Sequence, residues 1–216
     1  MPIPAWKMDK YRLVERYREE NLTAEKGQIV FAGSSLMEMF PVHEWAAGLG
    51  PDAPRVYNRG VGGWRTEDML ATLDAQVTGL APRRLFINIG TNDLSDPSVT
   101  IDALIARYEE ILDRVDAAVP GIDVTLMAYY PINIDAAANE GMRQTLRIRT
   151  NERIRQANAA VADLARRRGY RYRDFNAPLT DAQGRLKAEY TTEGMHITPE
   201  GYRAIWPLVA QAILEA

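Results

Sequence analysis

Two adjacent hydroxyl side chains stand where a mostly apolar stretch meets residues compatible with a helix. Residues 28–32 are the mostly apolar stretch, and Gly33, Ser34 and Ser35 follow directly. This order is typical of a strand, a tight turn and a helix start, so we expect Ser35 at the carboxyl edge of a sheet. Free backbone N–H groups of the first helical turn can stabilise negative charge there. Such a serine can attack a carbonyl carbon, although the run by itself is also compatible with an ordinary helix cap.

Three further polar segments accompany this turn. Residues 58–63 (Asn-Arg-Gly-Val-Gly-Gly) and residues 90–93 (Gly-Thr-Asn-Asp) each lie at the end of a predicted strand, and residues 193–196 (Glu-Gly-Met-His) precede the last predicted helix. Glycines let backbone N–H groups approach an oxyanion because no Cβ blocks them. Asn92 can add a side-chain amide donor to the same charge. These residue types are the ones that an acyl-transfer site requires.

A serine nucleophile needs a base, and the chain has two histidines. His196 lies on a loop expected beside the sheet edge, and Glu193, three residues earlier, can hold the other ring nitrogen across one turn. His43 has no orienting group in a familiar pattern. Either histidine can supply the imidazole, and we expect His43 to be a surface or packing residue.

Alternating strands and helices must position these segments. Strands are expected over residues 28–32, 55–58, 84–89, 123–128 and 170–174, and helices over residues 11–20, 66–77, 100–119, 142–168 and 199–214. Thr66 and Thr198 are expected to cap two of the helices. This alternation favours a parallel sheet with helices on both faces. Because ligands of open α/β sheets bind outside the carboxyl ends of the strands, the irregular residues 129–141 are expected to wall a site.

The four segments, in this order and spacing from Gly33 to His196, resemble the signature blocks of the SGNH hydrolases, the GDSL-like esterase/lipase family. The resemblance implies an α/β fold, a three-layer α/β/α sandwich of flavodoxin-like type, with a five-stranded parallel sheet. It implies that Ser35 is the nucleophile and also an oxyanion donor through its backbone N–H, with Gly63 and Asn92 as the other donors and His196 as the base. The second segment looks most similar to the platelet-activating-factor acetylhydrolase-like and carbohydrate esterase branch.

Two positions depart from the family pattern. The family has Asp where Ser34 stands, and this change affects the local turn. The family also has Asp where Glu193 stands. We expect Glu193 to orient His196, since Glu fills this role in other triads; a dyad in which a backbone carbonyl orients His196 is the alternative. The common Gly-x-Ser-x-Gly elbow is absent, which disfavours the large α/β-hydrolase fold.

Other residues near the segments have a functional and a structural interpretation. Trp64 either lines a substrate pocket or belongs to the core, and Tyr130, after the fourth strand, is expected to line the same pocket. Five arginines within residues 143–155 suggest an anion site, but acidic residues nearby favour a solvated helix face. Asp93 is expected to be structural.

Composition limits the classes of function. The 216 residues suit one domain, 1–216, with residues 1–24 as a helical extension packed on it, and the net charge of −3 does not favour nucleic acid as a partner. Without cysteine, thiolate metal sites are impossible, and no metal or other cofactor is expected. No stretch is apolar enough to span a bilayer, and the first residues lack the apolar core of a signal peptide, so we expect a cytoplasmic protein.

Residues and resemblance together imply a serine esterase that acts on short acyl groups, acetyl above all, through an acyl-enzyme. The expected partner is a small-molecule ester, an acetylated sugar or a lipid-like ester, and the resemblance adds a homodimer. Two alternatives stay open. One is an acyltransferase that passes the acyl group to another hydroxyl, and the other is a non-enzymatic binding protein that retained the fold.

Overall fold

The computed structural model of the protein describes residues 5–215. The expectation of a leader-free N-terminus rests partly on residues 1–4, which lie outside the described residues. The chain forms two compact units, one of residues up to 90 together with 106–125, and one of residues 91–105 together with those from 126 onward.

The elements alternate along the chain as expected. The strands are β1 (Ile29–Gly33), β2 (Val56–Gly60), β3 (Arg84–Asn88), β4 (Asp123–Met127) and β5 (Arg171–Arg173). The α-helices are α1 (Ala5–Thr23), α2 (Ser35–Glu38), α3 (Val42–Ala47), α4 (Thr66–Ala71), α5 (Leu73–Gln76), α6 (Ile101–Ala118), α7 (Glu140–Ile148), α8 (Asn151–Arg168) and α9 (Pro199–Leu214). Short 3-10 turns are η1 (Thr78–Leu80), η2 (Asp93–Ser95), η3 (Ile134–Ala136), η4 (Ala177–Leu179) and η5 (Ala188–Tyr190).

The strands lie in the order β2-β1-β3-β4-β5. β1 runs parallel to both of its neighbours, so that Phe31 stands opposite Asn58 on β2 and Phe86 on β3. The rings of Phe31 and Phe86 stack with centroids 4.4 Å apart, and every residue of β1 and β3 is buried. The start of β4 belongs to the first unit, and its end, with β5, to the second. The predicted α/β fold with a five-stranded parallel sheet is confirmed.

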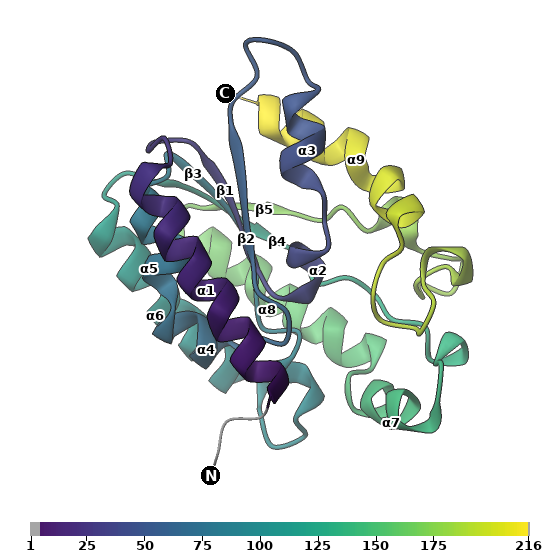
Figure 1. Ribbon diagram of the computed structural model, residues 1–216. Coiled ribbons are helices and arrows are strands. Elements are labelled where there is room, and N and C mark those ends of the chain that lie inside the picture. The colour runs from purple at the N-terminus through teal and green to yellow at the C-terminus, as the bar shows by residue number, and fades with distance from the viewer. Residues whose placement is uncertain (1–4, 216) are drawn as a thin grey trace. The chain divides into compact units, whose positions relative to one another are not determined.

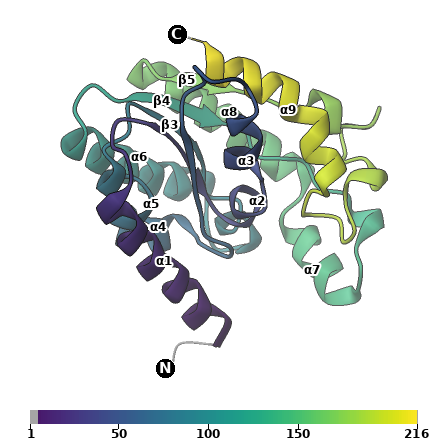
Figure 2. The same cartoon turned by 45° about the horizontal axis from the view of Figure 1, so that its top comes forward.

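Helices cover the strands of the first unit from two sides. α1 lies along α5 on one side, while α2 and α3 contact β2 on the other, as the two ribbon views show (Figures 1 and 2). Arg18 on α1 pairs with Asp74 on α5, with Nε 2.6 Å from Oδ2, and the Tyr17 hydroxyl donates to the carbonyl of Gly60 at 3.0 Å. The helix predicted over residues 11–20 is confirmed, is longer than predicted, and packs on this unit.

In the second unit, α8 packs on β5 and α9 contacts η4 and η5. Thr198 caps α9 as predicted, because its hydroxyl accepts the backbone N–H of Gly201. Within residues 5–215, no helix combines the length and the apolar composition that crossing a membrane requires.

The prediction of one helix over residues 142–168 is wrong, since α7 ends at Ile148 and α8 begins at Asn151. Arg149 takes a non-helical conformation, with φ −83° and ψ 65°. Thr150 then caps α8, because its hydroxyl accepts the backbone N–H of Arg153 at 3.1 Å. The break turns the Arg149 side chain into the interior.

The helix predicted over residues 66–77 is also broken, at Thr72. The Thr72 hydroxyl accepts the indole N–H of Trp64 at 3.0 Å and lies 2.8 Å from the carbonyl oxygen of Asp68. Arg65, rather than the predicted Thr66, occupies the N-cap of α4. A buried side chain that binds the helix backbone in this way competes with the regular helical hydrogen bonds.

Gly60→Ala is expected to lower the free energy of unfolding by about 3 kcal/mol or more, because overpacking against backbone cannot relax. A Cβ at Gly60 would lie 2.1 Å from the backbone nitrogen of Glu38. Gly48→Ala is the matched control: its φ is −85°, and its Cβ would meet the carbonyl oxygen of Trp45 at 3.4 Å. Urea unfolding of the two variants measures the difference, and equal stabilities would contradict the close approach of α2 to β2.

Candidate active site

The serine turn lies at the end of β1, and Ser35 is the first residue of α2. The carbonyl of Ser34 accepts the backbone N–H groups of Met37 and Glu38 at 3.1 and 2.9 Å, which closes the turn. The backbone N–H of Ser35 therefore precedes the first intrahelical bond, where helices direct N–H groups to acceptors outside the helix. Ser34 is buried and its side chain makes no capping bond, so serine is accommodated there as a turn residue.

Two amide side chains hold the serine turn against its neighbouring strand. Asn58 donates from Nδ2 to the carbonyls of Met37 and Phe40 at 2.7 and 2.8 Å, which fastens α2 to β2. Gln76, buried on α5, donates from Nε2 to the carbonyl of Gly33 at 3.3 Å and to a carbonyl of β2 at 2.8 Å. The ends of β1 and β2 are thus tied to one buried amide, so the serine turn has a rigid base.

Gly63 occupies a tight turn directly after β2. A hydrogen bond of 3.2 Å from the last to the first residue closes residues 61–64, and Gly63 has φ +80°. This is the conformation of the third residue of a type II turn, which side chains other than glycine rarely adopt. Glu38 accepts the N–H of Gly62 and pairs with Lys10, whose Nζ lies 2.8 Å from Oε1. The turn that presents the Gly63 N–H is therefore anchored to the helix that begins with the serine.

The fourth segment folds the Glu193 carboxylate back over its own loop. Oε1 accepts the backbone N–H groups of Met195, at 3.0 Å, and of His196, and it lies 3.1 Å from Nδ1 of the His196 ring. The glutamate side chain is one methylene longer than aspartate, and because it curves back over the loop, its carboxylate still reaches the imidazole. With Nδ1 held by a carboxylate, Nδ1 carries the proton and Nε2 is the basic nitrogen.

Burial and hydrogen bonding act in opposite directions on Glu193. Burial raises the pKa of the Glu193 carboxyl, but the hydrogen bonds from the ring and backbone of His196 outweigh it, and the pKa lies below its ordinary value. Glu193 is therefore a carboxylate at neutral pH. Its other oxygen, Oε2, is buried and has no hydrogen-bond partner among the described residues.

Asn92, in the third segment, is held by a buried arginine. Nη2 of Arg149 donates to Oδ1 of Asn92 at 2.8 Å, and Nε donates to the hydroxyl of Ser95 at 2.8 Å. Burial lowers the pKa of Arg149 to about 10, while the charges of Glu193 and Asp93 oppose this effect. Arg149 thus remains a cation at neutral pH, and its charge faces carboxylates of the third and fourth segments.

The predicted solvated arginine face is wrong for Arg149, which is 3% exposed. Arg153 also turns inward, donating to the backbone carbonyls of Asp96 and Val99. The break between α7 and α8 is the reason, because it removes the single helical face on which the prediction was based. Asp93 is buried at the start of η2, as expected of a structural residue.

The structure corrects the predicted aromatic pocket. Trp64 is fully buried, with its ring in edge contact with Tyr11 at a centroid distance of 5.3 Å. Of its two alternative roles, the structure shows the core. Tyr130 is 2% exposed, and burial raises the pKa of its phenol. Neither ring presents surface to a substrate, because rings of this size bury more apolar area inside the unit than at a solvated edge.

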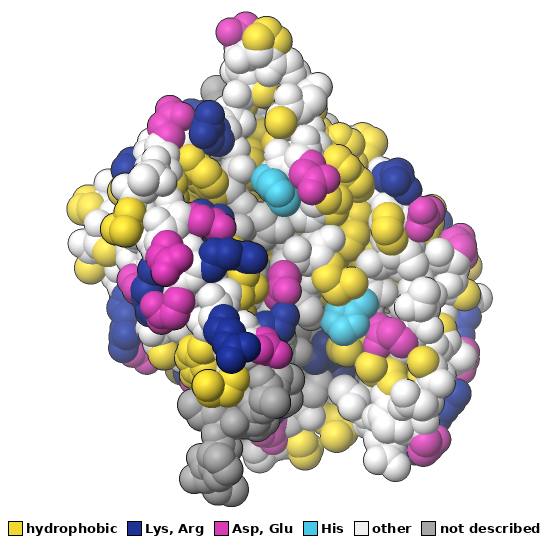
Figure 3. Space-filling view, viewed as in Figure 1, with side chains coloured by type: hydrophobic (Ala, Val, Ile, Leu, Met, Phe, Trp, Pro, Cys, Tyr) yellow, Lys and Arg dark blue, Asp and Glu magenta, His cyan; other side chains and the backbone are white. Residues whose placement is uncertain are grey.

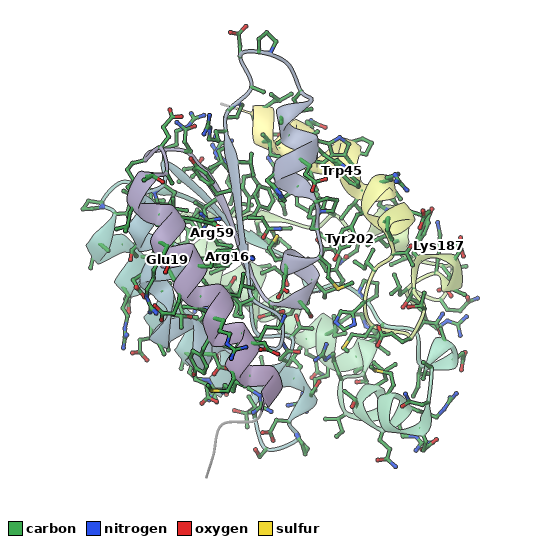
Figure 4. All side chains as sticks on the ribbon, in the orientation of Figure 1. Arg16, Glu19, Trp45, Arg59, Lys187 and Tyr202 are labelled. Carbon is green, nitrogen blue, oxygen red and sulfur yellow. The ribbon has the colours of Figure 1, made fainter. Side chains whose placement is uncertain are left out.

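His43 lies on the surface of the first unit. Its side chain is 52% exposed, and it lines a cleft of about 630 Å³ formed with α1 and β2. Arg16 and Arg59, labelled in Figure 4, line the same cleft and both pair with Glu20. Basic and acidic side chains are interspersed over α1 in Figure 3. His43 thus has the surface position that was predicted.

The predicted site residues fall into two groups. Ser35 and Gly63 belong to the first unit, where a hydrogen bond from the N–H of Gly62 to the Glu38 carboxylate joins the turn after β2 to α2. Asn92, Glu193 and His196 belong to the second unit, where a buried arginine contacts both segments. Within the described range 5–215, no His, Asp and Glu side chains are grouped so as to hold a metal ion.

The supporting contacts of Glu38, Asn58, Gln76 and Arg149 were not predicted. Glu38 bonds to Lys10 and to the N–H of Gly62, which lie 28 and 24 positions away, so no local signal could have found it. Asn58 opens the second segment, so its place in the motif was visible while its bracing contacts were not. For Arg149 the signal was the Thr-Asn pair that follows it, which is typical of a helix start.

Comparisons with known proteins place the chain among acylhydrolases. A profile of the GDSL-like Lipase/Acylhydrolase family matches residues 31–204. A structure from Streptococcus pneumonia, provisionally assigned as a platelet activating factor, is 30% identical, with a TM-score of 0.81 over 94% of this chain and 92% of its own.

Two further structures share the fold at lower identity. A Bacteroides fragilis protein, provisionally assigned as an acylhydrolase, is 24% identical, with a TM-score of 0.75 over 92% of this chain and 94% of its own. Axe2, an acetylxylan esterase from Geobacillus stearothermophilus, is 18% identical, with a TM-score of 0.67 over 89% and 96%. A search of curated proteins found no match.

Proposed function

The chain belongs to the GDSL-like lipase/acylhydrolase family and is a carboxylic ester hydrolase, and from this premise we propose that Ser35 is its nucleophile. His196 is the base, and Glu193 orients it. The backbone N–H groups of Ser35 and Gly63 and the side-chain amide of Asn92 stabilise the oxyanion. An acyl-enzyme on Ser35 is the intermediate.

The observation that carries this proposal is the pairing of Glu193 with His196. The position that departs from the family pattern still puts a carboxylate oxygen 3.1 Å from Nδ1 of the histidine ring. A catalytic imidazole needs such a partner, because the partner selects the tautomer and stabilises the imidazolium that forms. A protein that had kept only the fold would have no need to hold this carboxylate beside the ring of His196.

In the first half of the reaction, Nε2 of His196 takes the hydroxyl proton of Ser35 as Oγ attacks the ester carbonyl carbon. The carbonyl π electrons move to oxygen, and the three proposed N–H donors stabilise the new charge. The intermediate collapses, the C–O bond to the alcohol breaks, and His196 returns the proton to the leaving oxygen.

In the second half, water replaces the alcohol. Nε2 of His196 takes a proton from the water, whose oxygen attacks the acyl carbon of the ester on Ser35. The second tetrahedral intermediate uses the same oxyanion donors. Its collapse releases the carboxylic acid and restores the hydroxyl of Ser35.

We further propose acetyl and other short acyl groups as substrates, on an acetylated sugar or a lipid-like alcohol. The support is the resemblance to the carbohydrate esterase branch and the lack of a long apolar insertion in the sequence that could cover a fatty chain. The acetylxylan esterase that shares the fold acts on such a substrate by its name.

Hydrolysis of p-nitrophenyl acetate, butyrate and octanoate by the purified protein tests the proposal. We expect acetate to be cleaved with the highest kcat/KM, and Ser35→Ala to abolish cleavage of all three. Adding a sugar alcohol as acceptor separates hydrolysis from acyl transfer, because a transferase would form the new ester in place of free acetate. A folded protein that cleaves none of the esters would support the binding-protein alternative.

A further inference from the structure

Arg149 is a buried cation at the bend between α7 and α8, and every nitrogen of its guanidinium has a partner. Nη2 donates to Oδ1 of Asn92 at 2.8 Å, Nε donates to the hydroxyl of Ser95 at 2.8 Å, and Nη1 contacts the sulfur of Met195. Met195 lies beside His196. The Arg149 side chain therefore contacts both residues 90–93, which contain Asn92, and residues 193–196, which contain His196.

We infer that Arg149 is a positioning residue for the oxyanion hole: it fixes the orientation of the Asn92 amide, an inference that rests on the proposed function. The amide of Asn92 has an accepting end, Oδ1, and a donating end, Nδ2. A guanidinium can only donate, so it selects the rotamer in which Oδ1 faces it. Nδ2 is thereby turned away from the guanidinium. Nδ2 is the donating end of the amide, which is the end that an oxyanion requires.

The hydrogen bond also strengthens the donor. A charge-assisted bond from a cation to Oδ1 draws electron density from the amide, so the N–H groups of Nδ2 become more positive. This effect is large where the charge is shielded from water, and Arg149 is 3% exposed. Orientation and polarisation therefore act in the same direction on the stability of the oxyanion.

The position demands arginine. The planar fork contacts Asn92, Ser95 and Met195 at once, whereas the single ammonium of lysine, on a shorter effective reach, cannot hold three partners in one plane. The cation is kept charged by Glu193 and Asp93 nearby. Arg149→Lys thus keeps the charge of the site and removes the geometry.

A double-mutant cycle between Arg149→Lys and Asn92→Ala tests the inference, with p-nitrophenyl acetate as substrate. We expect Arg149→Lys to lower kcat by about 30-fold with KM changed less than about twofold, a smaller loss than the ~10²–10³-fold that follows complete removal of one oxyanion donor, because the Asn92 amide is misoriented and not removed. In the Asn92→Ala background, the same change should lower kcat by less than about threefold, because the amide through which it acts is gone. Arg147→Lys, exposed on α7 and paired with Glu140, is the matched control and should keep the wild-type kcat.

Ser95→Ala is a second, milder variant that removes one anchor of the guanidinium without touching the charge. It should lower kcat several-fold in the wild-type background and leave kcat unchanged in the Asn92→Ala background. This variant supplies the test if Arg149→Lys fails to fold, as judged by circular dichroism and thermal unfolding.

The outcomes separate the inference from the function on which it rests. Equal loss of kcat from the Arg149 or Ser95 change in both backgrounds overturns the inference alone, since these residues would then act only on the fold. Wild-type kcat for Asn92→Ala overturns the oxyanion role of Asn92 and, with it, the inference. Serine-dependent ester cleavage in that same experiment would leave the nucleophile assignment standing.

Discussion

Ser35→Ala and His196→Ala should each lower kcat for p-nitrophenyl acetate by about 10⁴-fold or more, the loss seen when one member of a nucleophile–base pair is removed. Alanine at position 35 has no oxygen to form the acyl-enzyme. Alanine at position 196 leaves the serine hydroxyl with its proton, and a hydroxyl is a weak nucleophile at neutral pH. The two residues act as a unit, so the double variant should be no slower than the slower single variant.

These losses must occur in folded protein to carry the assignment. Both side chains are small or partly exposed, and the bonds that close their turns use the backbone N–H or carbonyl groups of these residues, which alanine retains. Thermal unfolding should therefore be close to that of the wild type. His43→Ala is the control for histidine removal, because His43 is half exposed and is not among the proposed site residues. Wild-type kcat in either Ser35→Ala or His196→Ala would overturn the mechanism.

The parts of the fold that sequence predicts well are those decided by local chemistry. The apolar run of β1 and the glycine-serine turn after it are signals within a few residues, and both lie where they were expected. The cap of α9 is a further case, since Thr198 and Pro199 are adjacent. The helix breaks at Thr72 and Arg149 depended instead on buried side-chain bonds to residues elsewhere, which periodicity does not contain.

The candidate site also contains features that local sequence predicts and features that depend on residues far away in the chain. Glu193 and His196 are one helical turn apart, so their pairing could be inferred from spacing, and the structure brings them within 3.1 Å. Arg149 contacts Asn92 from 57 positions away in the sequence. Among the neighbouring arginines, the only local mark of Arg149 is the Thr-Asn pair that follows it, which indicates a helix start but not a buried side chain. For Trp64 the sequence left pocket and core open, and the structure shows the core, since a position directly after Gly63 does not by itself expose a ring.

Glu193→Gln should lower kcat by about 10³–10⁴-fold with little change in KM, as expected when a neutral amide replaces the carboxylate that orients a catalytic histidine. In the wild type, Oε1 accepts the backbone N–H groups of Met195 and His196 and faces Nδ1 of the ring. Glutamine keeps the length and the accepting oxygen of the side chain. It removes the negative charge that stabilises the imidazolium formed in each half of the reaction.

Glu193→Asp is the variant that isolates length from charge. Aspartate is shorter by one methylene, about 1.5 Å of reach, so its carboxylate cannot satisfy the loop N–H groups and the ring together without a shift of the backbone. We expect a loss of kcat smaller than that of Glu193→Gln, with a lower thermal stability. Stopped-flow or steady-state rates with p-nitrophenyl acetate, alongside thermal unfolding, measure both.

If Glu193→Gln keeps the wild-type kcat, the carboxylate does not orient His196, and a backbone carbonyl must hold Nδ1 in a Ser-His dyad. A large loss of kcat in Glu193→Gln and a small one in Glu193→Asp would instead show that His196 requires the negative charge of the carboxylate.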